Sequence, residues 1–198
     1  LFTLTKFNST ATIISYNADP LVSVEELNEQ SYHPSGNTPL YDAIAATVRA
    51  TEYSLKESKK KVNVLFIIMT DGEENDSKEY TKDKIVELIR EKEAAGWTFT
   101  YLGANQDSWR VGASIGVSAG NVANFNQAQT GQTMSVLASA TGRYARAGAA
   151  APSYSAHGTY QFYAGYDSRS LSSSDVATAE NTALKIEAID DDEGKKKK

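Results

Sequence analysis

The longest hydrophobic pattern in the chain is a nearly unbroken apolar run from Val62 to Met69, which leads directly into Thr70, Asp71 and Gly72. Because the run is short and does not alternate between apolar and polar residues, it predicts a strand buried on both faces, as in a parallel sheet covered by helices on each side. A buried helix segment is the alternative, but the Val, Ile and Phe content and the Asp-Gly stop favour the strand. Asp71 would then follow the carboxyl end of this strand, where ligands bind in open α/β sheets, so a functional carboxylate is favoured. The alternative is an aspartate that serves only a turn or a helix cap.

Two further patterns precede this run. Residues 1–7 alternate between apolar and polar side chains, a turn follows at residues 8–10, and residues 11–16 form a second strand-like segment, so a hairpin is predicted. A helix is predicted from Thr38 to about residue 59, with Thr38 as N-cap and Pro39 at the first helical position. Its apolar stripe consists of Leu40, Ile44, Val48 and Leu55.

The elements expected after the apolar run alternate between helix and strand. They are a helix over about residues 82–95 ending at Gly96, a strand over 97–103, a short helix over 108–116, an extended piece over 122–125 and a helix over about 131–147. In the last helix, the spacing predicts that Met134, Leu137, Ala138, Thr141 and Tyr144 face inward. This succession of strands and helices predicts an α/β fold with a doubly wound, mostly parallel sheet flanked by helices.

The composition changes at about residue 148, so the sequence divides into a domain over 1–147 and an extension over 148–198. Residues 148–174 are rich in Ala, Ser, Gly and Tyr, which indicates either a mobile extension, the favoured interpretation, or a docking segment rich in aromatic residues. Residues 175–189 fit one more helix, although Ala183 to Ile189 also alternates like a strand.

Charge and composition narrow the function. The net charge is −5 although the last four residues are all Lys, so the rest of the chain is more acidic, which argues against a nucleic-acid surface. The absence of Cys excludes disulfides and thiolate chemistry. No apolar run reaches membrane-spanning length and no signal peptide is visible, so we expect a cytoplasmic protein that does not insert into membranes. The chain opens on Leu1 within a strand-like segment, which indicates a piece of a longer protein.

Two motifs in this order resemble those of a von Willebrand factor A domain. The first is Ser-Gly-Asn-Thr-Pro-Leu-Tyr-Asp-Ala-Ile over residues 35–44, and the second is Ile-Ile-Met-Thr-Asp-Gly-Glu-Glu-Asn over residues 67–75. The segment over residues 96–107 is similar to that of a subgroup of bacterial and phage proteins with this domain. The resemblance covers residues 1 to about 146 and implies a doubly wound sheet with a divalent-cation site at its carboxyl edge.

The resemblance also implies ligands for the cation. Thr38 matches the family's ligand at the start of a helix, and Asp71 matches its ligand after the central strand. A hydroxyl and a carboxylate are hard oxygen donors that suit Mg²⁺ or Mn²⁺, and an acidic side chain of a protein partner often completes the coordination in this family. Five further residues are expected to line the same crevice, namely Asn37, Gly72, Glu73, Asn105 and Asp107, although a turn role is an equal alternative for Asn105 and Asp107.

The sequence departs from the family at the remaining ligands, because it contains no Asp-x-Ser-x-Ser motif. By the family's order, residues 1–7 match the second strand, so the first strand and its ligands are expected before Leu1. The favoured interpretation is that this upstream segment exists outside the sequence. The alternatives are that another chain supplies it, or that residues 184–189 fold into the gap and offer Asp190. Binding of Mg²⁺ is therefore expected only where the upstream ligands are supplied.

Other candidate sites carry less weight. Gly112-Ala113-Ser114-Ile115-Gly116 matches the nucleophile-elbow string of hydrolases, but a helix and not a strand is predicted before it. Glu73, Glu74 and Asp76 most simply form a solvated acidic rim, and the alternatives are that they repel anionic partners or hold a second cation. We therefore expect a metal-dependent protein-binding module and not an enzyme. The alternative is a structural or assembly protein with a vestigial metal site, in which the extension docks neighbouring molecules.

Overall fold

The computed structural model describes residues 1–58, 62–104, 107–147 and 162–163. Its strands form two separately hydrogen-bonded sheets within these residues. The first is the antiparallel hairpin of β1 (Phe2–Asn8) and β2 (Ala11–Asp19). The second is a parallel sheet in the order β3-β4-β5, made of β3 (Leu65–Thr70), β4 (Thr98–Ala104) and β5 (Val122–Phe125). The predicted hairpin and the α/β class are therefore confirmed.

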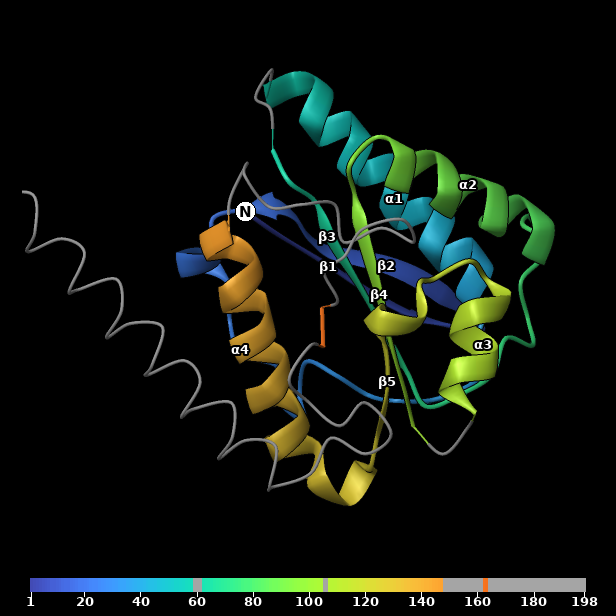
Figure 1. The fold of residues 1–198 in the computed structure, drawn as a ribbon. Helices are drawn as coiled ribbons and strands as arrows, with labels where there is room; N and C mark the ends of the chain where they lie inside the picture. The colour runs from blue at the N-terminus through green and yellow to red at the C-terminus, as the bar shows by residue number, and fades with distance from the viewer. Residues whose placement is uncertain (59–61, 105–106, 148–161, 164–198) are drawn as a thin grey trace, which may run out of the picture.

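Helices cover both faces of the parallel sheet (Figure 1). The first face packs against α1 (Leu40–Ser58), α2 (Lys82–Ala94) and α3 (Ser108–Ser114). The opposite face packs against α4 (Thr130–Ala147). Short 3-10 turns complete the described chain at η1 (Leu21–Ser23), η2 (Ala119–Asn121) and η3 (Gln127–Gln129). This arrangement is the predicted sheet flanked by helices, and the predicted helix boundaries agree with the observed ones to within two residues.

Strand β4 is the centre of the core, because all seven of its residues are buried. Its side chains alternate between the faces, so Phe99 and Tyr101 pack with α1–α3 while Leu102 and Ala104 pack toward α4. The prediction that the 62–69 run is buried on both faces was wrong. In β3, Ile67 and Met69 are 37% and 36% exposed, because β3 pairs on one side only within the described residues.

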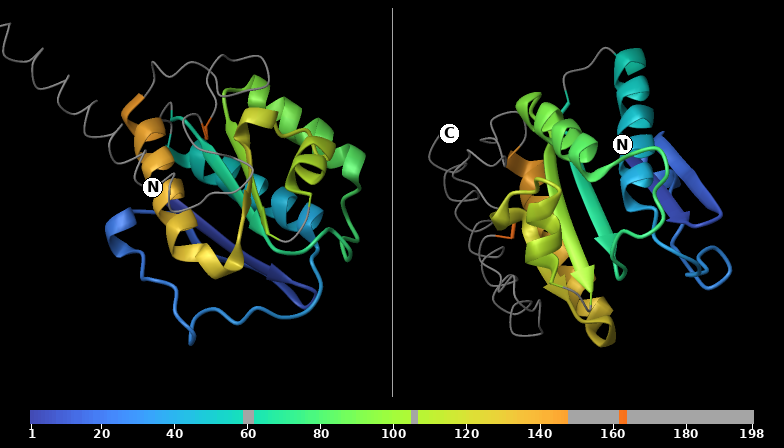
Figure 2. Two further views of the ribbon diagram at one scale, coloured as in Figure 1. Left: turned by 60° about the horizontal axis from the view of Figure 1, so that its bottom comes forward. Right: turned by 90° about the vertical axis from the view of Figure 1, so that its right-hand side faces the viewer.

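Helix α1 connects the hairpin to the parallel sheet (Figure 2). Its predicted stripe is buried against the sheet, and Leu40, Ile44 and Val48 are almost fully inaccessible to solvent. On the hairpin side, the Thr47 hydroxyl donates to the Thr5 hydroxyl at 2.7 Å. One helix thus holds the two sheets in a fixed relation through an apolar face and a polar flank.

In α4 the buried stripe is rotated from the predicted one. Thr133, Val136, Ala140 and Tyr144 are buried, whereas Met134 and Ala138, which were predicted to face inward, are exposed. Both sets have helical spacing, so periodicity alone did not choose between them. The face is chosen by the sheet, since Tyr144 extends over β3 and its hydroxyl donates to the Val64 carbonyl at 3.2 Å.

Burial of Glu93 in α2 predicts a pH-dependent stability. Its Oε1 atom has no hydrogen-bond partner among the described residues, and burial raises the pKa of the carboxyl group from 4.5 to about 7. The folded chain therefore holds this proton more tightly than the unfolded chain, so the stabilisation is full below pH 4.5 and is lost as the pH rises from 4.5 to about 7.

We expect Glu93→Gln to be more stable than the parent at pH 8, by on the order of 2–3 kcal/mol, with little difference near pH 4. Urea unfolding at both pH values measures this. The exposed Glu87→Gln on the same helix is the control, and equal pH profiles for Glu93→Gln and the parent would contradict the prediction.

Candidate functional site

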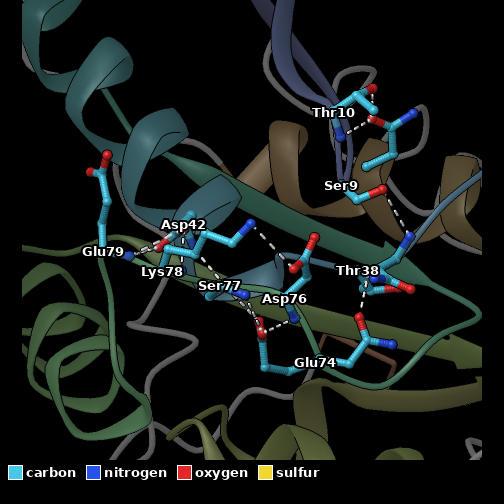
Figure 3. A network of polar contacts seen from close by, with 12 residues as sticks. Ser9, Thr10, Thr38, Asp42, Glu74, Asp76, Ser77, Lys78 and Glu79 are labelled. Atoms are coloured by element: carbon cyan, nitrogen blue, oxygen red, sulfur yellow. Dashed lines mark hydrogen bonds and ion pairs between the residues drawn. The ribbon is translucent and has the colours of Figure 1, made fainter.

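The carboxyl end of β3 and the amino end of α1 meet through a two-way set of hydrogen bonds, which we call the clasp (Figure 3). It joins residues 38–42, at the start of α1, to residues 74–80, in the loop that follows β3. Each segment supplies side-chain acceptors for the backbone N–H groups of the other. The clasp therefore fixes the geometry of the edge at which Thr38 and Asp71 were predicted to meet.

In one direction, the loop satisfies the free N–H groups of the first turn of α1. The Tyr41 N–H donates to Glu74 Oε2 at 3.0 Å, and the Asp42 N–H donates to Ser77 Oγ at 3.2 Å. The helix begins at Leu40, and the Pro39 carbonyl accepts the first helical bond from the Ala43 N–H. Pro39 is thus the N-cap, and the prediction that Thr38 is the N-cap with Pro39 as first helical residue was wrong by one position.

In the other direction, the Asp42 carboxylate organises the loop. The backbone N–H groups of Lys78, Glu79 and Tyr80 donate to it at 2.7, 3.1 and 2.8 Å. The Glu74 carboxylate also accepts from the Asp76 and Ser77 N–H groups and from the Ser77 hydroxyl. Glu74 therefore orders the loop. The prediction that it belongs to a solvated acidic rim was wrong.

The clasp places the Thr38 hydroxyl against the residue that follows Asp71. The Thr38 N–H donates to Asn75 Oδ1 at 2.7 Å, and the Asn75 N–H donates back to the Thr38 carbonyl at 3.2 Å. A Cβ atom added to Gly72 would lie 2.5 Å from Thr38 Oγ1. Gly72 is thus the residue that lets the hydroxyl approach the end of β3. Asp71 is exposed immediately after β3 ends at Thr70.

The other predicted crevice residues have separate local partners. The Asn37 N–H donates to the Ser9 hydroxyl at 3.3 Å, in the turn of the hairpin. Glu73 accepts from Arg110 Nη2 at 2.8 Å, which links the loop to α3 across the edge of the sheet. Asp107 accepts from the Arg110 N–H at 3.2 Å and caps α3, so it has the turn role that was the alternative for it. Asn105 and Asp190 lie outside the described residues.

The edge offers oxygen donors for a hard cation but not a complete set of ligands. Thr38 contributes a hydroxyl and Asp71 a carboxylate, and these are donor types that suit Mg²⁺. Within the part of the chain that the structure describes, no group of three or more acidic, His or Cys side chains is arranged to hold a metal ion. A cation held by Thr38 and Asp71 would need its remaining ligands from water or from outside these residues.

The Gly112 to Gly116 string has a packing role. A Cβ atom at Gly112 would lie 2.8 Å from Val122 Cγ2, so this glycine allows α3 to pack closely on β5. Gly116 follows the helix with a φ of +95°, a conformation that favours glycine. Ser114 ends α3, and its hydroxyl donates to the Val111 carbonyl at 2.9 Å. The string lacks the strand-turn-helix geometry of a nucleophile elbow.

The sequence patterns did not predict the paired roles of Asp42 and Glu74. A signal was available, because the first turn of every helix leaves N–H groups that need acceptors, and both carboxylates belong to the quoted motifs. The sequence did not show that each carboxylate serves the other's segment, because 32 positions separate them (74 minus 42).

The clasp predicts a large effect of Asp42→Ala. This change leaves three backbone N–H groups without their acceptor, so we expect a loss of about 2–4 kcal/mol in the free energy of unfolding. Hydrogen exchange at residues 78–80 should become faster than in the parent chain. The matched control is Asp83→Ala in the first turn of α2, which removes an exposed carboxylate and should cost less than about 1 kcal/mol. Equal losses for the two variants would show that the clasp contributes little.

Comparison with known proteins gives one match. The family model for the von Willebrand factor type A domain matches residues 2–139. Searches of curated proteins and of solved structures found no match. None of the described helices is both long and apolar enough to cross a membrane. The matched residues contain the hairpin, the parallel sheet, the clasp and most of α4, and the chain belongs to the von Willebrand factor type A family, whose domains generally mediate protein interactions.

Proposed function

We propose that this protein is a protein-binding module that uses Mg²⁺ or Mn²⁺ to capture a carboxylate side chain of its partner. The observation that carries the proposal is the packing of the Thr38 hydroxyl against Gly72, next to Asp71. This packing sets the Thr38 hydroxyl beside the residue that follows Asp71, at the carboxyl edge of a parallel sheet, which supports a site where these two hard oxygen donors bind one cation. Family membership supports a binding role and not a particular partner.

In this proposal Thr38 and Asp71 are two of the cation's protein ligands. Bound Mg²⁺ keeps exchangeable positions, and one of these would accept an oxygen of the partner's carboxylate. The clasp holds Thr38 from both its N–H and its carbonyl, so the hydroxyl is positioned before any cation arrives. The Arg110–Glu73 ion pair borders the same edge and places one charge of each sign near an approaching acidic partner.

The alternative is a structural or assembly protein with a vestigial metal site. It is favoured by the incomplete set of acidic ligands within the described residues. It is also favoured by Phe162 and Tyr163, two aromatic residues of the C-terminal region that pack into the core. We keep the prediction that the protein is not an enzyme, and an esterase activity lost on Ser114→Ala would overturn it.

Titration with Mg²⁺ and Mn²⁺ separates the two candidates when it is carried out on the full-length protein, so that any ligands outside this sequence are present. The binding module predicts heat of binding and a thermal shift, with affinity weakened by about tenfold or more in Asp71→Ala and in Thr38→Val. Glu57→Ala removes a carboxylate at the opposite end of α1 and should leave the affinity unchanged. No heat and no thermal shift in the parent chain would favour the assembly protein.

Gly72→Ala tests the geometry of the proposed site without removing a ligand. The added methyl group must displace the Thr38 hydroxyl, so we expect weaker Mg²⁺ binding and a loss of about 1–3 kcal/mol in the free energy of unfolding. Gly131→Ala in α4 is the matched control, because a Cβ atom there meets nothing within 4 Å and a helical Gly-to-Ala change stabilises by about 0.5–1 kcal/mol. Unchanged cation binding in Gly72→Ala would show that the Thr38 hydroxyl is not a ligand of the cation.

A further inference from the structure

The hydroxyl of Thr70 holds the turn that carries the chain out of β3. It donates to the Gly72 carbonyl at 3.0 Å and accepts from the Gly72 N–H at 3.1 Å. A threonine hydroxyl has a single proton, and here that proton is directed to the turn. One side chain therefore restrains both backbone polar groups of Gly72, and Asp71 lies between the two residues that these bonds join.

These bonds start from a buried side chain. Thr70 is the last residue of β3 and is only 8% exposed, whereas Asp71 immediately after it is exposed. A bond made by a buried hydroxyl restrains the backbone more than an exposed one, because water does not readily replace a lost buried partner. The turn is therefore fixed from the buried end of the strand.

The Thr70 side chain lies on the face of the sheet that α1 covers. Side chains alternate along a strand, and Ile68, two residues earlier, belongs to the core beneath α1. Thr38 precedes α1, and a Cβ atom added to Gly72 would lie 2.5 Å from its Oγ1 atom. Gly72 is thus held by hydrogen bonds from Thr70 and closely approached by the Thr38 hydroxyl.

Gly72 in this way connects the two candidate ligands. A peptide bond joins it to Asp71, and the Thr38 hydroxyl reaches it through space. A shift of the Gly72 backbone would change the position of the carboxylate relative to the hydroxyl. The clasp begins at Glu74, so the Thr70 hydroxyl restrains the part of the loop that precedes the clasp.

A restraint of this kind affects which cation a site prefers. Mg²⁺ requires near-ideal octahedral geometry at short distances, whereas Ca²⁺ accepts more ligands in flexible arrangements. A loosened turn between Thr70 and Gly72 would therefore weaken the binding of Mg²⁺ more than that of Ca²⁺. Removal of a ligand, in contrast, would weaken the binding of both cations.

We propose that Thr70 is a positioning residue of the cation site, and that its hydroxyl makes the site selective for Mg²⁺ over Ca²⁺ by fixing the turn through Asp71 to Gly72. The inference rests on the proposed function, because it requires Thr38 and Asp71 to bind one cation. Thr70 is not a ligand in this proposal, since its hydroxyl acts on the backbone of Gly72.

Thr70→Val tests the proposal, because it keeps the shape of the side chain and removes the hydroxyl. In the full-length protein we expect the Mg²⁺ affinity to fall by about tenfold or more, as for other residues that orient a metal ligand. The Ca²⁺ affinity should fall by less, so the ratio of the two affinities falls several-fold. Thr70→Ser keeps the hydroxyl and should restore the parent's ratio. Isothermal titration with each cation measures both affinities.

Two further variants separate positioning from other effects. Thr133→Val in α4, on the opposite face of the sheet, also removes a buried hydroxyl that donates to a backbone carbonyl, that of Gln129 at 3.2 Å. It should leave both affinities unchanged. Asp71→Ala removes a ligand, so it should weaken the binding of both cations and leave their ratio close to that of the parent.

A measurement without cation reports on the turn alone. Hydrogen exchange at the Gly72 amide, followed by NMR, should be at least about tenfold faster in Thr70→Val than in the parent protein. Thr70→Ser and Thr133→Val should exchange this amide at the parent's rate, because both keep the Thr70 or Ser hydroxyl that accepts from it.

The outcomes distinguish failure of this inference from failure of the proposed function. If the parent binds Mg²⁺ and Thr70→Val keeps the parent's ratio of affinities, the cation site stands and Thr70 does not position it. A parent that prefers Ca²⁺, or an unchanged exchange rate at Gly72 in Thr70→Val, would overturn the inference in the same way. A parent that binds no Mg²⁺ overturns the proposed function, and the positioning role with it. Should circular dichroism show that Thr70→Val is unfolded, Thr70→Ala is measured against the same criteria.

Discussion

The clasp between α1 and the loop after β3 determines the shape of the functional edge. A helix start exposes N–H groups with a partial positive charge, and a carboxylate is their best acceptor. Here the Glu74 carboxylate of the loop accepts from the helix, and the Asp42 carboxylate of the helix accepts from three N–H groups of the loop. Burial and the nearby Glu74 charge raise the pKa of the Tyr41 phenol. Backbone N–H groups of each segment bond to side-chain acceptors of the other segment, so the two segments order each other.

This mutual ordering explains why Thr38 and Gly72 meet. Thr38 precedes the helix by two residues and is held at both its N–H and its carbonyl by contacts with the clasp. Gly72 follows β3 and has no side chain to occupy the position that the hydroxyl needs. Thr38 is thus positioned by backbone contacts that exist without a cation. That is the usual requirement for a site that must be ready for its ligand.

The two ends of the sheet serve different interactions. The carboxyl edge is polar and is formed by loops, whereas the α4 face near the amino ends is apolar and holds Phe162 and Tyr163. Strand β4 runs between the two regions and is buried along its whole length, so both regions are built on the same buried strand. The von Willebrand factor type A fold in this chain therefore has a polar edge at one end of the sheet and a buried aromatic pair toward the other.

The sequence by itself determined the local elements and the family. Hydrophobic periodicity located the hairpin, the helices and the parallel strands, because these depend on spacing along the chain. The two motifs placed Thr38 and Asp71 at the edge of the sheet, and Gly96 ends α2 with the left-handed φ that its position required. Only the tertiary structure decided which of two possible faces α4 buries, why β4 and not β3 is fully buried, and how Asp42 and Glu74 serve each other. It also decided that Phe162 and Tyr163 enter the core, although they belong to a stretch rich in Ala, Ser, Gly and Tyr without clear periodicity. Such pairings join residues far apart in the chain, and local patterns carry no information about which distant partner will satisfy a buried group.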